Sequence, residues 1–100
     1  MKDLLKGLAS LQDGETLRDA SGRLVGYRDG NSLRDASGVL VGYVDGNSVR
    51  DAAGVLVYYK TQWGNTVEIR DSAGVLRAYQ DGDAVRDASG VLVYYKDRSK

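Results

Sequence analysis

The chain has 100 residues, and its 14 Lys and Arg residues balance 14 Asp and Glu residues to a formal net charge of zero. This length suits a single domain. A balanced charge argues against nucleic acid bound through a basic face and against an anionic membrane surface as partners. The sequence contains no Cys and no His, so it lacks thiolate ligands, disulfides and the commonest general base. No cofactor or metal ion is therefore expected.

Residues 1–11 form a leader, which reads MKDLLKGLASL. Its apolar residues recur at helical spacing and predict a short amphipathic helix that caps one end of the following sheet. They are Met1, Leu4, Leu5, Leu8 and Leu11. Residues 7–11 also fit the strand spacing of the remaining chain, so an extra strand is the alternative; Gly7 would cost a helix about 1 kcal/mol. The leader is too short and too polar for a signal peptide or a membrane span, and localisation stays open.

A repeat domain spans residues 12–97, followed by a polar tail at 98–100. Ten glycines recur in it at steps of eight residues, with two steps of ten. They lie at positions 14, 22, 30, 38, 46, 54, 64, 74, 82 and 90. The turns read either Asp-Ala-Ser-Gly, as at 35–38, or Tyr-x-Asp-Gly, as at 43–46. Gly comes last in both, which predicts a type I turn followed by a G1 bulge.

The segments between the turns are rich in Val, Leu and Tyr and predict ten strands. We expect them at 15–19, 23–27, 31–35, 39–43, 47–51, 55–61, 65–71, 75–79, 83–87 and 91–95. The fold class is therefore all-β, an antiparallel β-meander of about ten short strands in a single-layer or coiled sheet. If both turn types have this geometry, Val41 lies opposite Leu33 on one neighbouring strand and opposite Val49 on the other. Equivalent residues of successive repeats would then form straight rows across the sheet, with no shift in register. Because closure needs shear, this register disfavours a barrel, and a face-to-face dimer ranks second after a single sheet.

Alternation along the strands predicts two different faces. One carries an apolar row with a Tyr row beside it, interrupted by Arg77. The apolar row is Leu17, Val25, Leu33, Val41, Val49, Val57, Ile69, Val85 and Val93. The opposite face alternates Leu with Arg18, Arg34, Arg50, Arg70 and Arg86. This Arg row can bind an anionic polymer, or its stems can simply cover the leucines.

The repeat resembles tandem β-hairpin repeats of bacterial proteins, which carry variants of R-D-[SA]-[SA]-G and G-Y-x-D-G. The corresponding units here are R-D-A-S-G at 34–38 and G-Y-V-D-G at 42–46, and the resemblance covers residues 15–95. A designed repeat would share the same pattern. The resemblance implies an extended β-meander and no particular activity.

The candidate binding residues are aromatic. They are Tyr27, Tyr43, Tyr59, Trp63, Tyr79 and Tyr95. The five tyrosines would form a ladder at about 10 Å intervals that can stack sugar rings, or they pack on cross-strand neighbours. Trp63 lies at the tip of a hairpin lengthened by four residues and is the best single candidate for a partner contact. The Asp-Gly-Asn triplets at 29–31 and 45–47 do not match a calcium loop.

No pairing of a nucleophile with a base is visible, so the sequence predicts no enzyme. The expected function is a non-enzymatic structural or protein-interaction module that self-associates through its apolar face. The alternative is binding of a glycan or extended polymer on the Tyr ladder. The expected partners are a second copy or another protein, with carbohydrate as a further possibility.

Overall fold

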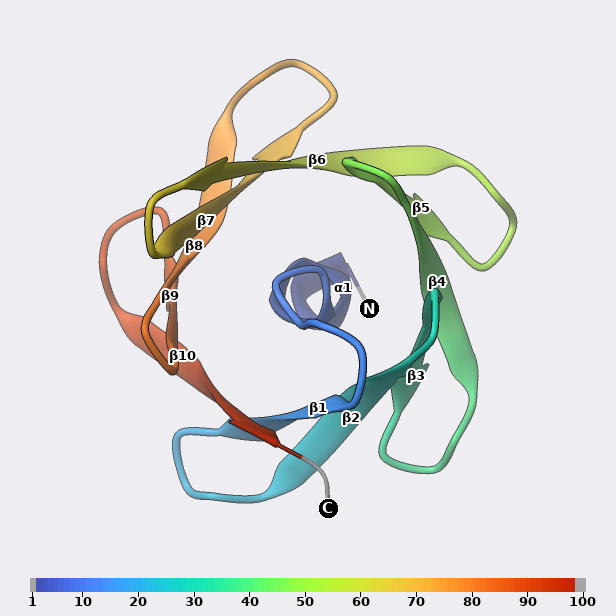
Figure 1. The fold of residues 1–100 in the computed structure, drawn as a ribbon, viewed down its shortest axis with the longest axis vertical. Coiled ribbons are helices and arrows are strands. Elements are labelled where there is room, and N and C mark those ends of the chain that lie inside the picture. Colours follow the sequence, from blue (N-terminus) through green and yellow to red (C-terminus); the bar gives the residue numbers. More distant parts are fainter. Residues whose placement is uncertain (1, 99–100) are drawn as a thin grey trace.

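The computed structural model describes residues 2–98, and the side chains of residues 4–97, as a closed antiparallel barrel around one helix. The helix α1 (Lys2–Leu8) lies inside the ring of strands (Figure 1). The strands are β1 (Glu15–Asp19), β2 (Leu24–Asp29), β3 (Ser32–Asp35), β4 (Leu40–Asp45), β5 (Ser48–Asp51), β6 (Leu56–Trp63), β7 (Thr66–Asp71), β8 (Leu76–Asp81), β9 (Ala84–Asp87) and β10 (Leu92–Arg98). Consecutive strands pair with each other, and β10 pairs with β1 to close the barrel.

The predicted fold class is confirmed. Each of the ten predicted strands begins within one residue of the observed start, and several run two or three residues further. Residues 2–8 of the leader form a helix, as predicted, but the helix fills the barrel interior rather than capping an end of an open sheet. Met1 of the predicted helix and residues 99–100 of the predicted tail lie outside the described residues. The preference for an open sheet over a barrel is wrong, because the expected register is not the one adopted.

The Asp-Ala-Ser-Gly turns have the predicted geometry. The amide of Gly38 donates to the carbonyl of Asp35 at 3.0 Å, and Gly38 has a φ of 90°. Asp35 Oδ1 accepts hydrogen bonds from the Ser37 and Val39 amides. The carboxylate therefore holds the turn together, as Asp does in this position of a turn.

The Asp-Gly turns and one β-bulge in each repeat depart from the predicted register. Asp45 pairs with Ser48, so only Gly46 and Asn47 form the loop, and Gly46 has the positive φ that a two-residue hairpin turn requires first. On the other side of the repeat, Arg34 pairs with Leu40 and Leu33 pairs with Gly42, which leaves Val41 bulged. The bulged residues are Val25, Val41, Val57, Arg77 and Val93.

These two departures supply the shear that closes the barrel. Leu33, Gly42 and Asp51 stand side by side across three strands, although Val49 is the repeat equivalent of Leu33. Each repeat therefore slips by two residues, and the five repeats slip by ten around the ring. Ten strands with a shear of ten tilt by about 36° and enclose a ring about 19 Å in diameter. A helix with its side chains is about 10–12 Å wide, so one helix fits inside.

The core lies between α1 and the inner wall. On odd-numbered strands the predicted apolar row points inward, and these residues are buried: Leu17, Leu33, Val49, Ile69 and Val85. Because each bulge shifts the alternation, the equivalent inward positions on the even-numbered strands are Gly26, Gly42, Tyr58, Ala78 and Tyr94. The self-association predicted on the apolar row would therefore need another surface.

Small residues make room where the helix approaches the wall. A Cβ on Gly26 would stand 2.7 Å from Leu8 Cδ2, and one on Gly42 would stand 2.8 Å from Leu5 Cδ1. On the helix itself, a Cβ at Gly7 would stand 2.6 Å from Cε2 of Tyr94. The two wall glycines and the helix glycine thus fix where α1 packs inside the ring.

Candidate functional site

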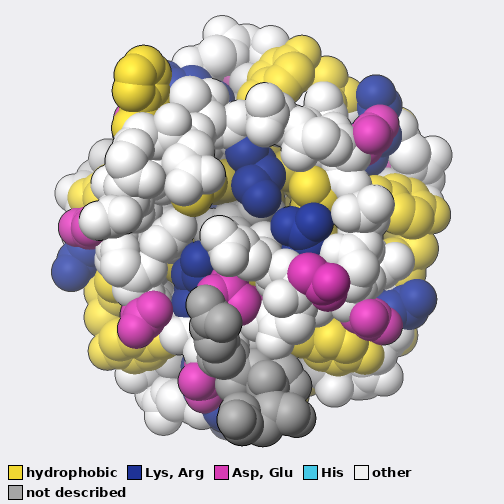
Figure 2. Space-filling model, in the orientation of Figure 1, with side chains coloured by type: hydrophobic (Ala, Val, Ile, Leu, Met, Phe, Trp, Pro, Cys, Tyr) yellow, Lys and Arg dark blue, Asp and Glu magenta, His cyan; other side chains and the backbone are white. Residues whose placement is uncertain are grey.

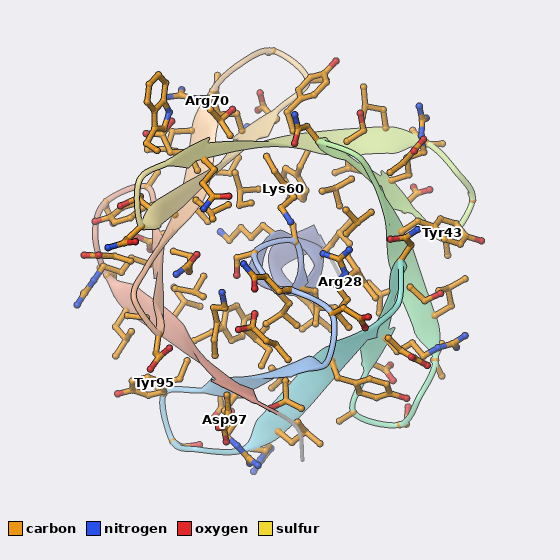
Figure 3. The ribbon with its side chains drawn as sticks, in the orientation of Figure 1. Arg28, Tyr43, Lys60, Arg70, Tyr95 and Asp97 are labelled. Carbon is orange, nitrogen blue, oxygen red and sulfur yellow. The ribbon has the colours of Figure 1, made fainter. Side chains whose placement is uncertain are left out.

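The predicted Tyr and Arg rows share the outer wall of the barrel. Each Tyr pairs across strands with an Arg: Tyr27 with Arg34, Tyr43 with Arg50, Tyr59 with Arg70, Tyr79 with Arg86, and Tyr95 with Arg18. Placing the two rows on opposite faces was wrong, because the bulges reverse the alternation. Tyr43 and Tyr95 point away from the barrel axis in Figure 3, and apolar groups ring the molecule in Figure 2.

The arginines of this belt are fixed by their own turns. Nη1 of Arg34 donates to the carbonyl of Gly38 at 2.9 Å, and four other arginines make the same bond to the glycine four residues on. Tyr27 and Tyr79 are half-buried, whereas Tyr43, Tyr59 and Tyr95 are 37–41% exposed. Successive tyrosines are separated by a fifth of a turn around the barrel, so a straight polymer cannot stack on all of them.

The hairpin of β6 and β7 carries the most exposed aromatic side chain of the described residues. Trp63 is 65% exposed and pairs with Thr66 beside the turn. Tyr59, Thr61 and Trp63 alternate along β6 and face outward, and Glu68 and Arg70 of β7 form an ion pair of 3.0 Å on the same face. The structure thus brings Tyr59 and Trp63 onto one surface, with Tyr79 beside it on β8, where it pairs with Glu68; Tyr27, Tyr43 and Tyr95 lie on other strands around the ring.

A second group of side chains, four of them polar, points into one mouth of the barrel, and sequence reasoning missed it. These residues follow the repeated Tyr by one position, and they are Arg28, Val44, Lys60, Gln80 and Lys96. Arg28 and Lys60 extend toward the axis above α1 (Figure 3), and basic groups gather in the hollow at the centre of this face (Figure 2). The sequence did contain a signal for this group: the residue after the repeated Tyr is basic in three of the five repeats.

Two of these cations have partners in the mouth. Arg28 donates from Nη1 to the Leu11 carbonyl at 2.9 Å, from Nε to the Gly30 carbonyl at 2.7 Å, and from Nη2 to Asn31 Oδ1 at 3.3 Å. Lys96 Nζ lies 3.1 Å from Glu15 Oε1, and both side chains are nearly buried. The half-buried Lys60 differs: burial, followed by repulsion from Arg28 and Lys96, lowers the pKa of its ammonium group to about 8.

The opposite end of the barrel has a cleft of about 470 Å³ between the turns at 51–55 and 71–75, beside Lys6. Arg77, which occupies the bulge position that is Val in four repeats, reaches Asp71 Oδ2 from Nε and Nη2 at 2.9 Å each. Hydrogen bonds from the Val75 amide and from Arg77 hold the pKa of the Asp71 carboxyl below its usual value. Arg77 and Asp71, which both line the cleft, therefore neutralise each other's charge.

Among the described residues, no three His, Cys, Asp or Glu side chains are grouped so that they could hold a metal ion. Over the same part of the chain, no helix has the length and apolar character needed to cross a membrane. Comparison of the chain with models of protein families, with curated proteins and with solved structures gave no match.

Proposed function

We propose that the protein is a non-catalytic interaction module that self-associates through the outer face of the β6–β7 hairpin. The observation that carries this proposal is the pair of exposed aromatic side chains, Tyr59 and Trp63, on one side of the longest hairpin. The members of the expected apolar row on the odd-numbered strands are buried against the core, so self-association needs exposed apolar groups such as these aromatic side chains of the outer wall.

A second copy is the partner that fits this surface best. Exposed Trp and Tyr are enriched among the residues that dominate binding energy. The net charge of zero gives two copies no long-range repulsion. In a two-fold contact the same patch meets itself, so the Glu68 and Arg70 charges beside the aromatic rings can pair between copies as well as within one.

Sedimentation velocity across a concentration series tests the proposal. We expect a concentration-dependent dimer for the natural chain and a monomer for Trp63→Ala. Tyr43→Ala is the matched control, because Tyr43 is also an exposed outer-wall aromatic but lies on β4. A natural chain that stays monomeric at millimolar concentration, or a Trp63→Ala variant that dimerises normally, would refute self-association through this hairpin.

Carbohydrate binding is the second candidate, and one observation favours it. Tyr59 and Trp63 lie about 14 Å apart along a single strand, so they avoid the curvature that separates the other tyrosines. A glycan array with the natural chain, Trp63→Ala and Tyr43→Ala tests this candidate. Binding lost only in Trp63→Ala supports it, and a flat response from the natural chain excludes it.

A further inference from the structure

Among the described residues, Lys60 is the cation of the barrel mouth whose ammonium group has no carboxylate partner. The ammonium group of Lys60 makes no ion pair or hydrogen bond to any residue whose side chain is described, whereas Arg28 and Lys96 have the oxygen partners given above. Glu15 is a carboxylate that acts on both Lys60 and Lys96, and its Oε1 already accepts from Lys96 and from the Gln12 amide at 2.7 Å. Of the described side chains that point into the mouth, Arg28, Lys60 and Lys96 are cationic and Glu15 is anionic, and the Asp13 carboxylate lies at the rim, where it accepts from the Gly30 amide.

Donors remain free to receive a ligand in this mouth. An ammonium group has three N–H donors and a guanidinium five. Lys60 uses none of its donors on the described residues, Lys96 uses one on Glu15, and Arg28 uses three on oxygens. Asp29 and Asp45 are neighbours of the inward positions along their strands, so their carboxylates alternate to the outer side and are exposed.

We propose that this mouth binds a small doubly charged oxyanion, either free phosphate or sulfate or the phosphoryl group of a larger ligand, between Lys60, Lys96 and Arg28. Three donor-rich cations from three different strands surround the site, and the barrel wall keeps part of the surrounding water away. An anion held there would interact in a lower effective dielectric constant than at an open surface. It would also remove the mutual repulsion of the three cations and offset the cost of burying Lys60.

Two charge-matched variants test the site. Lys60→Val places in β6 the residue that β4 carries at the equivalent position, Val44. Arg77→Val places at the other end of the barrel the residue found at the four equivalent bulges. Both remove one positive charge and introduce a residue that the repeat already accommodates, so non-specific attraction of anions changes equally in both. Lys60→Met, which keeps the length of the side chain, replaces Lys60→Val if that variant does not fold.

The measurement is a titration with sodium phosphate at constant ionic strength, followed by the NMR signals of the lysine side chains. We expect saturable binding in the natural chain and in Arg77→Val, binding at least about tenfold weaker in Lys60→Val, and an upward shift of the Lys60 titration midpoint when phosphate is bound. Sodium chloride serves as the control salt.

A parallel titration with phenyl phosphate distinguishes the source of the anion. Tighter binding of phenyl phosphate that depends on Lys60 supports a site for the phosphoryl group of a larger ligand, and tighter binding of inorganic phosphate supports a site for the free ion. The proposal is overturned if neither anion saturates the natural chain. It is also overturned if Lys60→Val and Arg77→Val lose binding equally, which would indicate only general attraction to a basic side chain.

Discussion

Replacing Lys60 by Val should stabilise the folded protein at neutral pH. The Lys60 ammonium group has a pKa lowered from 10.5 to about 8 in the folded chain, chiefly by burial. A pKa difference of one corresponds to about 1.4 kcal/mol, so the charged Lys60 destabilises the folded state by at most about 3.5 kcal/mol below pH 8. Val removes that cost and keeps apolar contact with the neighbouring side chains, as Val44 does in β4.

The pH dependence gives this prediction its sign. Between pH 8 and 10.5 the unfolded chain holds a proton on Lys60 that the folded chain has lost. The free energy of unfolding of the natural chain therefore increases as the pH rises through this window, because the folded chain no longer carries the buried charge of Lys60. Below pH 8 the destabilisation by the charged Lys60 does not change with pH. Lys60→Val lacks the group, so its advantage over the natural chain should shrink from pH 7 to pH 10.5.

Urea unfolding followed by circular dichroism, in buffers without phosphate or sulfate, measures both quantities. Subtracting the two proteins at each pH cancels the other titrating groups. The reasoning is refuted if Lys60→Val is no more stable than the natural chain at pH 7. A stability difference that is equal at pH 7 and pH 10.5 would also contradict it.

Three further predictions concern the core and the turns. Gly42→Ala should cost about 3 kcal/mol in urea unfolding, because its Cβ would meet both Leu5 and the Arg50 carbonyl; no loss would mean that α1 does not pack at this point. Leu8→Ala should cost about 2–5 kcal/mol through the cavity left in the core, and a loss below 1 kcal/mol would show a helix that is loosely held. Hydrogen bonds from Ser37 and Val39 lower the pKa of the Asp35 carboxyl below 3.8, so its contribution exists above that pH and is lost as the pH falls through the folded pKa. Asp35→Ala should therefore lower the Tm at pH 7 more than at pH 2. Ser37→Ala, which matches the third turn position of two other repeats, should lower the Tm less than Asp35→Ala does, because it removes the hydroxyl bond but keeps both amide bonds to Asp35 Oδ1.

The strand positions could be predicted because they depend on local turn chemistry. Gly38 and Asp35 mark a turn through interactions within five residues, and the same pattern recurs along the chain. The register could not be predicted in the same way. The segment 43–48 is compatible with Gly46 as the last residue of a four-residue turn or as the first of a two-residue loop. A one-residue change moves every following side chain to the other face.

The missed site follows from that same ambiguity. Val44 was expected within a turn but is buried in the barrel. Lys60 extends toward the barrel axis (Figure 3), and the Lys96 side chain is nearly buried against Glu15. The interior of the barrel depends on contacts between distant segments, because α1 packs against strands far from it in sequence. Gly26 and Gly42, which make room for α1, stand at wall positions that carry larger residues in the other repeats. Local patterns therefore identified the outer aromatics but not the cations of the mouth.

The seam between β1 and β10 makes folding depend on the two most distant strands of the chain. Every other strand pair is a hairpin, and hairpins form in about 1–10 μs. The seam joins segments about 80 residues apart, as in the bond from Thr16 Oγ1 to the Asp97 carbonyl, where the separation is 81. Until it closes, two strand edges and the inner wall remain open to pairing with other chains. During synthesis the barrel can close only after β10 has left the ribosome. Pairing of β10 with β1 therefore competes with aggregation through the open strand edges.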